Sequence, residues 1–402
     1  MILVIPDLLL KKQDNMVATY FQTSANPSNK EYFMKSRVFS VNSIEQIQPH
    51  LQDIRQEGLA PTLAIVFSSV IHDLKELRTV FAKYDIDVFG ATSSGEITND
   101  EIHEESIVVM LLDINRDAFR LNIFDGEGKT SYQLGQSAAE WAKTVYDNPA
   151  LMVMTAGLFT NGDEIVNGVT DAMARQVPLY GGRSGDDLRL QKTFVFSVSQ
   201  AISNGVVVLI FDQSIIDLKG VAVSGWKGIG TPKTITKAEG NIVYEIDNEP
   251  VLDVYNKYLD IGDDIKLALE YPLLLIRDDG TFVMRVAAAL NEDKSMVYMG
   301  TMPEGSKVRF SMPPGFEIID HAIEQMSEFH QRIPKSDAIV LFSCKARHMA
   351  LGPMVEDEIS AIHKLWEVPM VGFFTYGEIG PVPQGRCDFH NHTLVPVLIK
   401  EK

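Results

Sequence analysis

Residues 368–381 read VPMVGFFTYGEIGP, an apolar run that passes directly into a hydroxyl, a phenol, a glycine and a carboxylate. The apolar part has the length and composition of a buried strand, and the glycine indicates a loop at its end. Similar strand ends occur earlier in the chain, at GATSSGE (90–96) and GGRSGDD (181–187). Three such ends indicate an internal repeat.

Each loop closes a repeat made of an apolar strand, an amphipathic helix and a second apolar strand. The first strands are predicted at TLAIVFSS (62–69), LMVMTAGLF (151–159) and DAIVLFSC (337–344). The helices are predicted from apolar side chains that share one face of a 3.6-residue period: Leu74, Leu77 and Phe81; Ile165, Val169 and Met173; Val355, Ile359, Ile362 and Trp366. Asn161 and Glu164 predict a capping box, and Pro353 suits a first helical turn.

Repeats of this length favour parallel strands with a covering helix, which predicts an α/β fold. A further strand follows each loop, at 105–113, 204–212 and 392–400. Between the second and third repeats, residues 237–259 and 271–300 predict α+β elements joined by short turns. A glycine-rich segment places a boundary near residue 220, so the expected domains are 30–220 and 221–402, after an N-terminal extension at 1–29. Residues 1–15 lack the basic start and cleavage site of a signal peptide, and we expect them to be dispensable.

The bulk composition is that of a globular protein. The chain has 402 residues, of which 45% are hydrophobic and 22% charged, and a formal net charge of −18. A surface this negative repels phosphate backbones, so nucleic-acid binding is not expected. The two cysteines, Cys344 and Cys387, suggest reduced thiols and a cytoplasmic location. No apolar run approaches the ~20 residues needed to span a bilayer, so no membrane insertion is expected.

The three loops are the predicted ligand site. Glycine lets backbone N–H groups approach a ligand, Ser and Thr add donors and acceptors, and ligands of open α/β sheets collect beyond the carboxyl ends of the strands. The candidate ligand-binding residues are Ser94, Glu96, Arg183, Ser184, Asp186, Cys344, Arg347, Thr375, Tyr376 and Glu378. The alternative is that the loops are ordinary turns, or a duplication without function.

Two of these candidates have alternatives of their own. Arg183 has the fork geometry of a carboxylate clamp, but it could equally form a surface salt bridge. Cys344 could be activated by Arg347, or it could be a small buried hydrophobe.

Other chemistry has weaker signals. His390 and His392 alternate along one strand close to Cys387, which could indicate a metal site, although a fourth ligand is not evident. A Cys-dependent enzyme would use Cys344 with Arg347 and His348, without an obvious third group to orient them. The common phosphate-loop, dinucleotide, zinc-protease and nucleophile-elbow motifs are absent from the sequence. No catalytic residue is therefore predicted.

Taken together, eight segments resemble the FIST family over the chain from about residue 30 to its end: GATSSGEI, YGGRSGDD, SNGVVVLIF, GWKGIGTPKTITKAEGNIVYEIDNEPVLDVY, MPEGSKVRF, FSCKAR, GFFTYGEIGP and FHNHTL. The resemblance implies a FIST N-terminal and a FIST C-terminal domain, and a sensory protein that binds small ligands, with amino acids proposed. It implies a signalling partner in trans, such as a histidine kinase, a cyclic-dinucleotide enzyme or a chemoreceptor. In this sequence Arg183 and Ser184 stand where the family usually has small residues, and His392 stands where Gln is common, which leaves the ligand class open.

The resemblance and the loop chemistry lead to one hypothesis with two alternatives. An amino-acid-like ligand would have its carboxylate held by Arg183 or Arg347 and its ammonium held by Glu96, Asp186 or Glu378, with Tyr376 packing against it. Some family members are described as haem-bearing nitric-oxide sensors. One alternative is therefore haem with an axial ligand from His348, His390 or His392. The other is the Cys-dependent enzyme. No cofactor is otherwise predicted.

Overall fold

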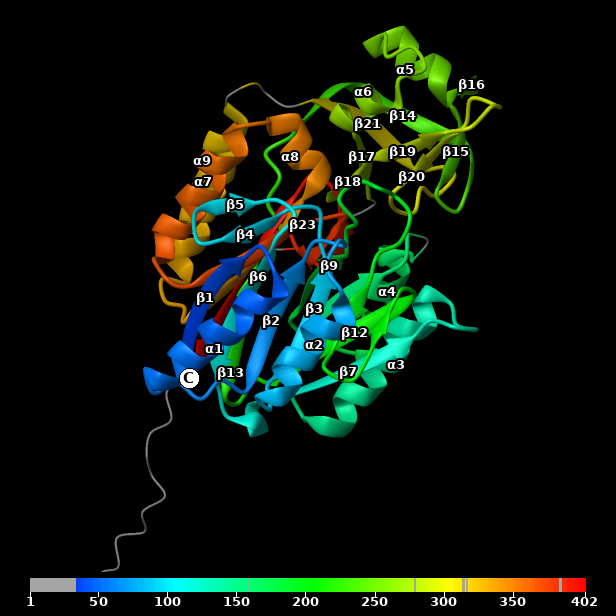
Figure 1. Cartoon of the computed structure of the whole chain (residues 1–402). Helices are drawn as coiled ribbons and strands as arrows, with labels where there is room; N and C mark the ends of the chain where they lie inside the picture. Colours follow the sequence, from blue (N-terminus) through cyan, green and yellow to red (C-terminus); the bar gives the residue numbers. More distant parts are fainter. Residues whose placement is uncertain (1–33, 159, 278–279, 313–314, 316, 383–384) are drawn as a thin grey trace, which may run out of the picture. The chain divides into compact units, whose positions relative to one another are not determined.

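The three predicted repeats fold as the sequence indicates. The computed structural model describes residues 34–402, except 159, 278–279, 313–314, 316 and 383–384, so the N-terminal extension predicted at 1–29 lies outside the described residues (Figure 1). The strands and helices of the repeats, in chain order, are β2 (Leu63–Ser68), α2 (Leu74–Lys83) and β3 (Asp87–Thr92); β8 (Pro149–Ala156), α4 (Gly162–Met173) and β9 (Leu179–Arg183); β22 (Ala338–Cys344), α9 (Met354–Trp366) and β23 (Met370–Thr375).

Strand pairing confirms the predicted α/β fold. In each repeat the two strands pair in parallel, as β2 with β3, β8 with β9 and β22 with β23. The strand that follows each repeat then pairs antiparallel with the first strand of that repeat. These following strands are β6 (Ile107–Asp113), β12 (Gly205–Asp212) and β26 (Leu394–Glu401).

Capping side chains set the starts of two of the helices. Asn161 accepts hydrogen bonds from the backbone N–H groups of Asp163 and Glu164, which confirms Asn161 as the N-cap of α4. The predicted capping box with Glu164 is not formed, because the Asn161 N–H donates to the Ser131 hydroxyl instead. Asp73 caps α2 in the same way. Pro353 lies at the N-cap of α9, whose buried face carries the predicted apolar residues. Local sequence therefore determines where these helices begin.

Each repeat belongs to a six-stranded sheet. The strand orders are β1-β6-β2-β3-β10-β11 for the first, β25-β24-β9-β8-β12-β7 for the second and β13-β26-β22-β23-β4-β5 for the third. The remaining strands are β1 (Lys35–Val41), β4 (Glu96–Thr98), β5 (Glu101–His103), β7 (Phe119–Asp125), β10 (Val195–Phe196), β11 (Ala201–Ile202), β13 (Ile216–Gly220), β24 (Glu378–Pro381) and β25 (Cys387–His390).

The three sheets exchange strands in a cycle. The chain leaves β3 of the first sheet through its loop and places β4 and β5 on the third sheet, beside β23. It leaves β23 and places β24 and β25 on the second sheet, beside β9. After β9 it returns with β10 and β11 to the first sheet, beside β3. Each predicted loop is therefore the point where the chain crosses from one sheet to the next.

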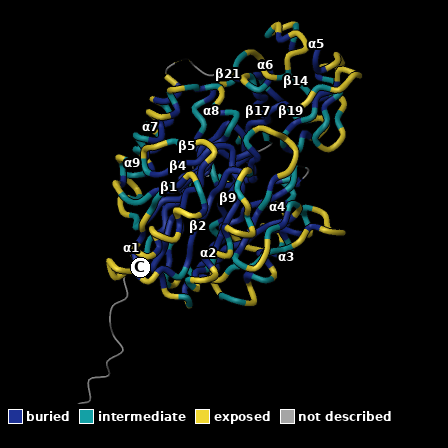
Figure 2. Tube along the Cα trace, in the orientation of Figure 1, coloured by how far each residue is buried: buried dark blue, intermediate teal, exposed yellow. Residues whose placement is uncertain are grey.

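The sheets are buried on both faces. Their inner faces share one apolar core, which includes Phe67, Met152 and Phe342. The outer faces are covered by α1 (Ile47–Gln56) and α2 on the first sheet, α3 (Ser131–Val145) and α4 on the second, and α7 (Glu317–Arg332), α8 (Lys345–Leu351) and α9 on the third. The strands accordingly run through the buried part of the trace in Figure 2. Two short 3-10 turns, η1 (Ile44–Gln46) and η2 (Arg116–Ala118), complete this part of the chain.

A fourth, antiparallel sheet is inserted between β13 and α7 and has its own apolar core. This sheet confirms the predicted α+β elements. Its strands are β14 (Lys227–Glu239), β15 (Ile242–Ile246), β16 (Glu249–Pro250), β17 (Leu273–Ile276), β18 (Phe282–Arg285), β19 (Ala287–Leu290), β20 (Met296–Tyr298) and β21 (Lys307–Met312), with helices α5 (Val251–Leu259) and α6 (Ile265–Glu270). The domain boundary near residue 220 stays a prediction. Among the described residues, no helix is long and apolar enough to cross a membrane.

Candidate functional site

The three loops (90–96, 181–187 and 372–378) meet and hydrogen-bond to one another; we refer to them as the loop crossing. The Ser94 N–H donates to the Phe374 carbonyl at 3.1 Å. The Gly185 N–H donates to the Thr92 carbonyl at 2.9 Å. The Tyr376 N–H donates to the Arg183 carbonyl at 3.0 Å, which closes the cycle. The fold thus brings the predicted loop residues together.

Two loop carboxylates occupy matching positions in the first and third repeats. Glu96 accepts from the Ser93 hydroxyl and from both the N–H and the hydroxyl of Ser106, the latter at 2.7 Å. Glu378 accepts in the same way from the Thr375 hydroxyl and from the N–H and hydroxyl of Thr393. Each carboxylate therefore ties its loop to the residue just before the following strand.

Burial dominates the electrostatics of both groups. Glu96 and Glu378 are 0% exposed. Loss of solvation raises the pKa of Glu96 to about 7 and the pKa of Glu378 to about 8, because the surrounding hydroxyl groups only partly replace water. These carboxylates are enclosed and provided with internal donors.

The second loop uses backbone donors instead. Asp186 accepts from the N–H groups of Leu190, Gln191 and Lys192, and from the Tyr376 hydroxyl at 2.6 Å. The same hydroxyl accepts from the N–H groups of Asp186 and Leu188. The Ser184 hydroxyl donates to the Thr155 carbonyl, and the Ser94 hydroxyl accepts from the N–H of Asp187. All of these predicted site residues contribute to the cohesion of the loop crossing.

The side chains of Cys344 and Arg347, at the end of β22 and in α8, have different partners. Arg347 is 0% exposed and pairs with Glu358 of α9, with its Nε 2.9 Å from Glu358 Oε2. Cys344 stays beside Glu378; burial, together with that carboxylate, raises the pKa of its thiol. His348 stacks on Phe374, and burial lowers its pKa to about 4. A protonated, enclosed thiol gives the Cys-dependent enzyme no activated nucleophile.

The histidines considered for haem or metal do not converge. His390 Nε2 lies 2.8 Å from the Gly380 carbonyl, and His392 Nε2 lies 2.7 Å from the Leu269 carbonyl. Cys387 Sγ donates to the Leu179 carbonyl. Within the described part of the chain, no three His, Cys, Asp or Glu side chains are placed to hold a metal ion. The Nε2 atoms of both histidines hydrogen-bond to backbone carbonyls, so axial ligation of haem would require these bonds to break, and haem stays an alternative.

Arg183 differs from the other predicted site residues. Its guanidinium donates to the Thr160 carbonyl, lies 5.4 Å from the centre of the Phe389 ring and has an Nε without a partner. It is 4% exposed, and among the described residues no carboxylate forms an ion pair with it. Burial lowers its pKa to about 10, against the opposing effect of Asp163, so it remains a cation near neutral pH. This buried charge lies beside the start of α4.

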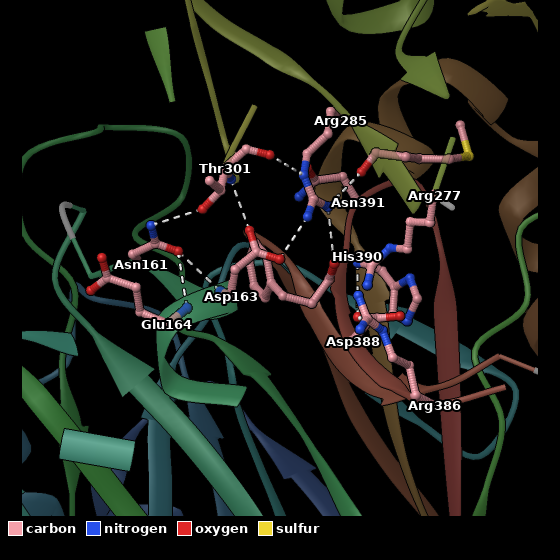
Figure 3. A network of polar contacts seen from close by, with 12 residues as sticks. Asn161, Asp163, Glu164, Arg277, Arg285, Thr301, Arg386, Asp388, His390 and Asn391 are labelled. Carbon is pink, nitrogen blue, oxygen red and sulfur yellow. Dashed lines mark hydrogen bonds and ion pairs between the residues drawn. The ribbon is translucent and has the colours of Figure 1, made fainter. Parts of the chain in front are cut away.

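A second polar network joins the start of α4 to the fourth sheet (Figure 3). Asp163 Oδ1 lies 2.6 Å from Arg285 Nη2, and its Oδ2 accepts from the Thr301 N–H at 2.8 Å. Arg285, on β18, also donates to the carbonyls of Thr301 and Phe389. Gly300 permits this approach, because a Cβ there would lie 2.7 Å from Arg285 Nε and 2.8 Å from Asp163 Oδ2.

Asp388 on β25 extends the charged region. It lies 2.8 Å from Arg277 Nη2 and 3.3 Å from Arg386 Nε, so one carboxylate is shared by two guanidinium groups. Burial raises the pKa of Asp388 to about 6, and Arg386 and Arg285 oppose that rise.

These side chains border a cavity of about 630 Å³, which we call the charged cavity. Its cations are Arg277, Arg285, Lys307 and Arg386, and its carboxylates are Asp163 and Asp388. Apolar surface comes from Val166, Leu275, Pro303 and Phe389. The cavity therefore combines charge and apolar surface between the second sheet, with its covering helix α4, and the fourth sheet.

Sequence reasoning singled out Arg183 and missed every residue that lines the charged cavity. One signal was available: Arg285 interrupts the apolar strand FVMRVAAA (282–289), and a buried arginine needs a partner. Nothing in the sequence connects it with Asp163, which lies 122 positions earlier.

Comparison with known proteins gives the family. The model of the FIST N domain matches residues 62–249, and that of the FIST C domain matches residues 252–381. Two curated relatives, uncharacterised proteins from Mycobacterium bovis (strain ATCC BAA-935 / AF2122/97) and Mycobacterium tuberculosis (strain CDC 1551 / Oshkosh), are each 25% identical over 373 residues, covering 84% of this chain and 90% of the relative. The chain therefore belongs to the FIST family, whose domains are associated with small-ligand sensing in signalling.

Proposed function

We propose that this protein is a sensory module that binds an amino acid or a similar small polar ligand, and that the ligand occupies the charged cavity. The observation that carries the proposal is the cavity itself, where about 630 Å³ of space is bordered by four cationic side chains and by apolar surface. Such a mixture of apolar walls and a few converging polar groups is typical of small-molecule sites.

The ligand would be held through its carboxylate. Arg386 is 58% exposed and Lys307 is exposed, so both can turn toward a bound anion. Arg277 has donors beyond those directed at Asp388, because a guanidinium carries five N–H groups. The carbon chain of the ligand would pack against Phe389 and Val166, which border the same space.

The placement of the cavity supports a role in signalling. Its walls come from α4 and β25, which belong to the second sheet and its helical cover, and from β17 and β18 of the fourth sheet. A ligand that contacts both parts favours one relative arrangement of them over others. A signalling protein that acts in trans, such as a histidine kinase, a cyclic-dinucleotide enzyme or a chemoreceptor, would sense that arrangement. A cytoplasmic location is part of the proposal and rests on the two free cysteines.

The ten candidate residues of the loop crossing, β22 and α8 remain a separate, untested prediction for ligand contact. They are at most 7% exposed, and apart from Arg183 their charged groups have internal partners. Arg183 is the residue that links the two regions, because its guanidinium lies against Phe389 of the cavity wall.

A thermal-shift screen of the full chain with the common amino acids tests the proposal. We expect at least one amino acid to raise the melting temperature in a concentration-dependent way, because a ligand that binds only the folded state stabilises it. Arg277→Gln should weaken that response, whereas Lys266→Gln, an exposed change on α6, should leave it intact. The absence of any response at high millimolar concentration, to the amino acids and to other small polar anions alike, would contradict the proposal.

A further inference from the structure

The charged cavity contains more positive than negative charge. Arg285 and Asp163 pair one to one at 2.6 Å. Asp388 forms ion pairs with both Arg277 and Arg386, and its single negative charge balances only one of their two positive charges. Lys307 lines the same space, and its Nζ donates to the Thr234 hydroxyl, with no carboxylate partner among the described residues. Among the described residues that border the cavity, four cations and two carboxylates leave an excess of two positive charges.

This excess is unusual for the chain as a whole, which carries a formal net charge of −18. Carboxylates outnumber basic side chains by 54 to 36, so a cavity with the opposite balance departs from the average surface. Walls of low dielectric, such as Phe389 and Leu275, strengthen the field of the charges between them.

The cavity also offers more donors than acceptors. Both oxygens of Asp163 are engaged, one by Arg285 and the other by the Thr301 N–H. Both guanidinium contacts of Asp388 go to its Oδ1. Among the described carboxylates of the cavity, an ammonium group would therefore find an acceptor only at Asp388 Oδ2, beside the positive charges of Arg277 and Arg386, whereas an anionic group would find donors on Arg386 and Lys307.

We infer that the ligand is a small dianion, with one anionic group held by Arg277 and Arg386 and the other by Lys307. A dianion neutralises the two excess positive charges of the cavity, whereas a zwitterion, which has no net charge, leaves them uncompensated. The apolar walls accommodate a short carbon chain between the two groups. A dicarboxylate and a phosphomonoester share this chemistry, and both are probes in the test below. The inference rests on the proposed function and narrows its ligand class.

The test is isothermal titration of the full chain, at constant ionic strength, with succinate, glycerol phosphate, butyrate and alanine. We expect saturable binding of succinate, of glycerol phosphate or of both, and none of butyrate or alanine. The stronger of the two dianions identifies the anionic group. Arg386→Gln and Lys307→Gln should each weaken binding about tenfold, since a charge-assisted hydrogen bond contributes ~1.5 kcal/mol. Lys266→Gln is the matched control and should leave the affinity unchanged.

Two outcomes overturn the inference. Binding of alanine or butyrate as tight as that of the dianions shows that the excess charge does not select the ligand. Unchanged dianion affinity in both Arg386→Gln and Lys307→Gln shows that the dianion binds elsewhere. In either case the proposed function stands. If none of these probes and no amino acid binds, the proposed function fails together with the inference.

Discussion

The loop crossing and the charged cavity both bury ionisable groups, but they satisfy them differently. In the loop crossing, Glu96 and Glu378 are surrounded by hydroxyl and backbone donors and have no water contact. In the charged cavity, carboxylates meet guanidinium groups, some of which keep donors directed to solvent. The first arrangement is closed and holds the three repeats together. The second has donors in excess, and a ligand can use them.

The largest expected effect is on stability, from Arg285→Met. The change leaves Asp163 without its partner and two carbonyls without a donor, and removing one member of a buried pair typically destabilises by about 3–5 kcal/mol. Urea unfolding measures the difference. Arg37→Gln breaks an exposed pair with Glu57 and serves as the control, with an expected change below ~1 kcal/mol. Equal effects of the two substitutions would contradict a structural role of the network.

The loop crossing should show a smaller loss with Tyr376→Phe. Its hydroxyl bonds Asp186 and the Leu188 N–H, so its removal leaves buried groups unpaired and should destabilise by about 1–3 kcal/mol. Tyr132→Phe removes a similar Tyr–Asp bond at the surface, to Asp171, and should be near neutral. Unfolding curves that coincide for the two variants would show that the loop crossing does not depend on this bond.

The pH dependence of stability tests whether the enclosed carboxylate of Glu378 is protonated in the folded state. The pKa of Glu378 is raised from 4.5 to about 8, so the folded state binds the proton more tightly than the unfolded state does. Its contribution is therefore fully present below about pH 4.5 and is lost as the pH rises through 8. The melting temperature should fall from pH 6 to pH 9 in the wild type and fall less in Glu378→Gln, which mimics the protonated group. Parallel curves would show that Glu378 is not protonated in this range.

The smallest effect concerns ligand affinity. Asp388 faces Arg277, Arg285, Arg386 and Asp163, and its pKa is raised to about 6. Asp388→Asn removes one negative charge, so succinate should bind roughly two- to fivefold tighter than to the wild type at pH 7.5. The two proteins should converge near pH 5, where Asp388 is protonated in the wild type. A constant ratio of the two dissociation constants between these pH values would exclude Asp388 from the binding region.

Sequence reasoning anticipated the local elements of this fold. Apolar runs such as LAIVFS predict buried strands, and the spacing of Leu77 and Phe81 predicts a helix, because both patterns depend on the few residues that form the element. The repeat itself, the cap at Asn161 and the loops at the strand ends were readable for the same reason. FIST membership followed from eight short segments in a fixed order.

The candidate site was less predictable. The sequence pattern predicted that Ser94, Glu96 and Glu378 lie in polar loops. It does not reveal whether a polar group in such a loop binds a ligand or hydrogen-bonds to another part of the chain. Their burial depends on β4 and β24 joining sheets that belong to other repeats.

By itself, the sequence determined the strands, the helices and their threefold repetition, because these arise from local periodicity and capping. Only the tertiary structure decided which sheet each crossing strand joins and which charges share a cavity. Asp163 meets Arg285 across 122 positions, and Arg277 meets Asp388 across the boundary of two sheets. Such contacts follow from the packing of whole layers, and no local pattern in the chain encodes them.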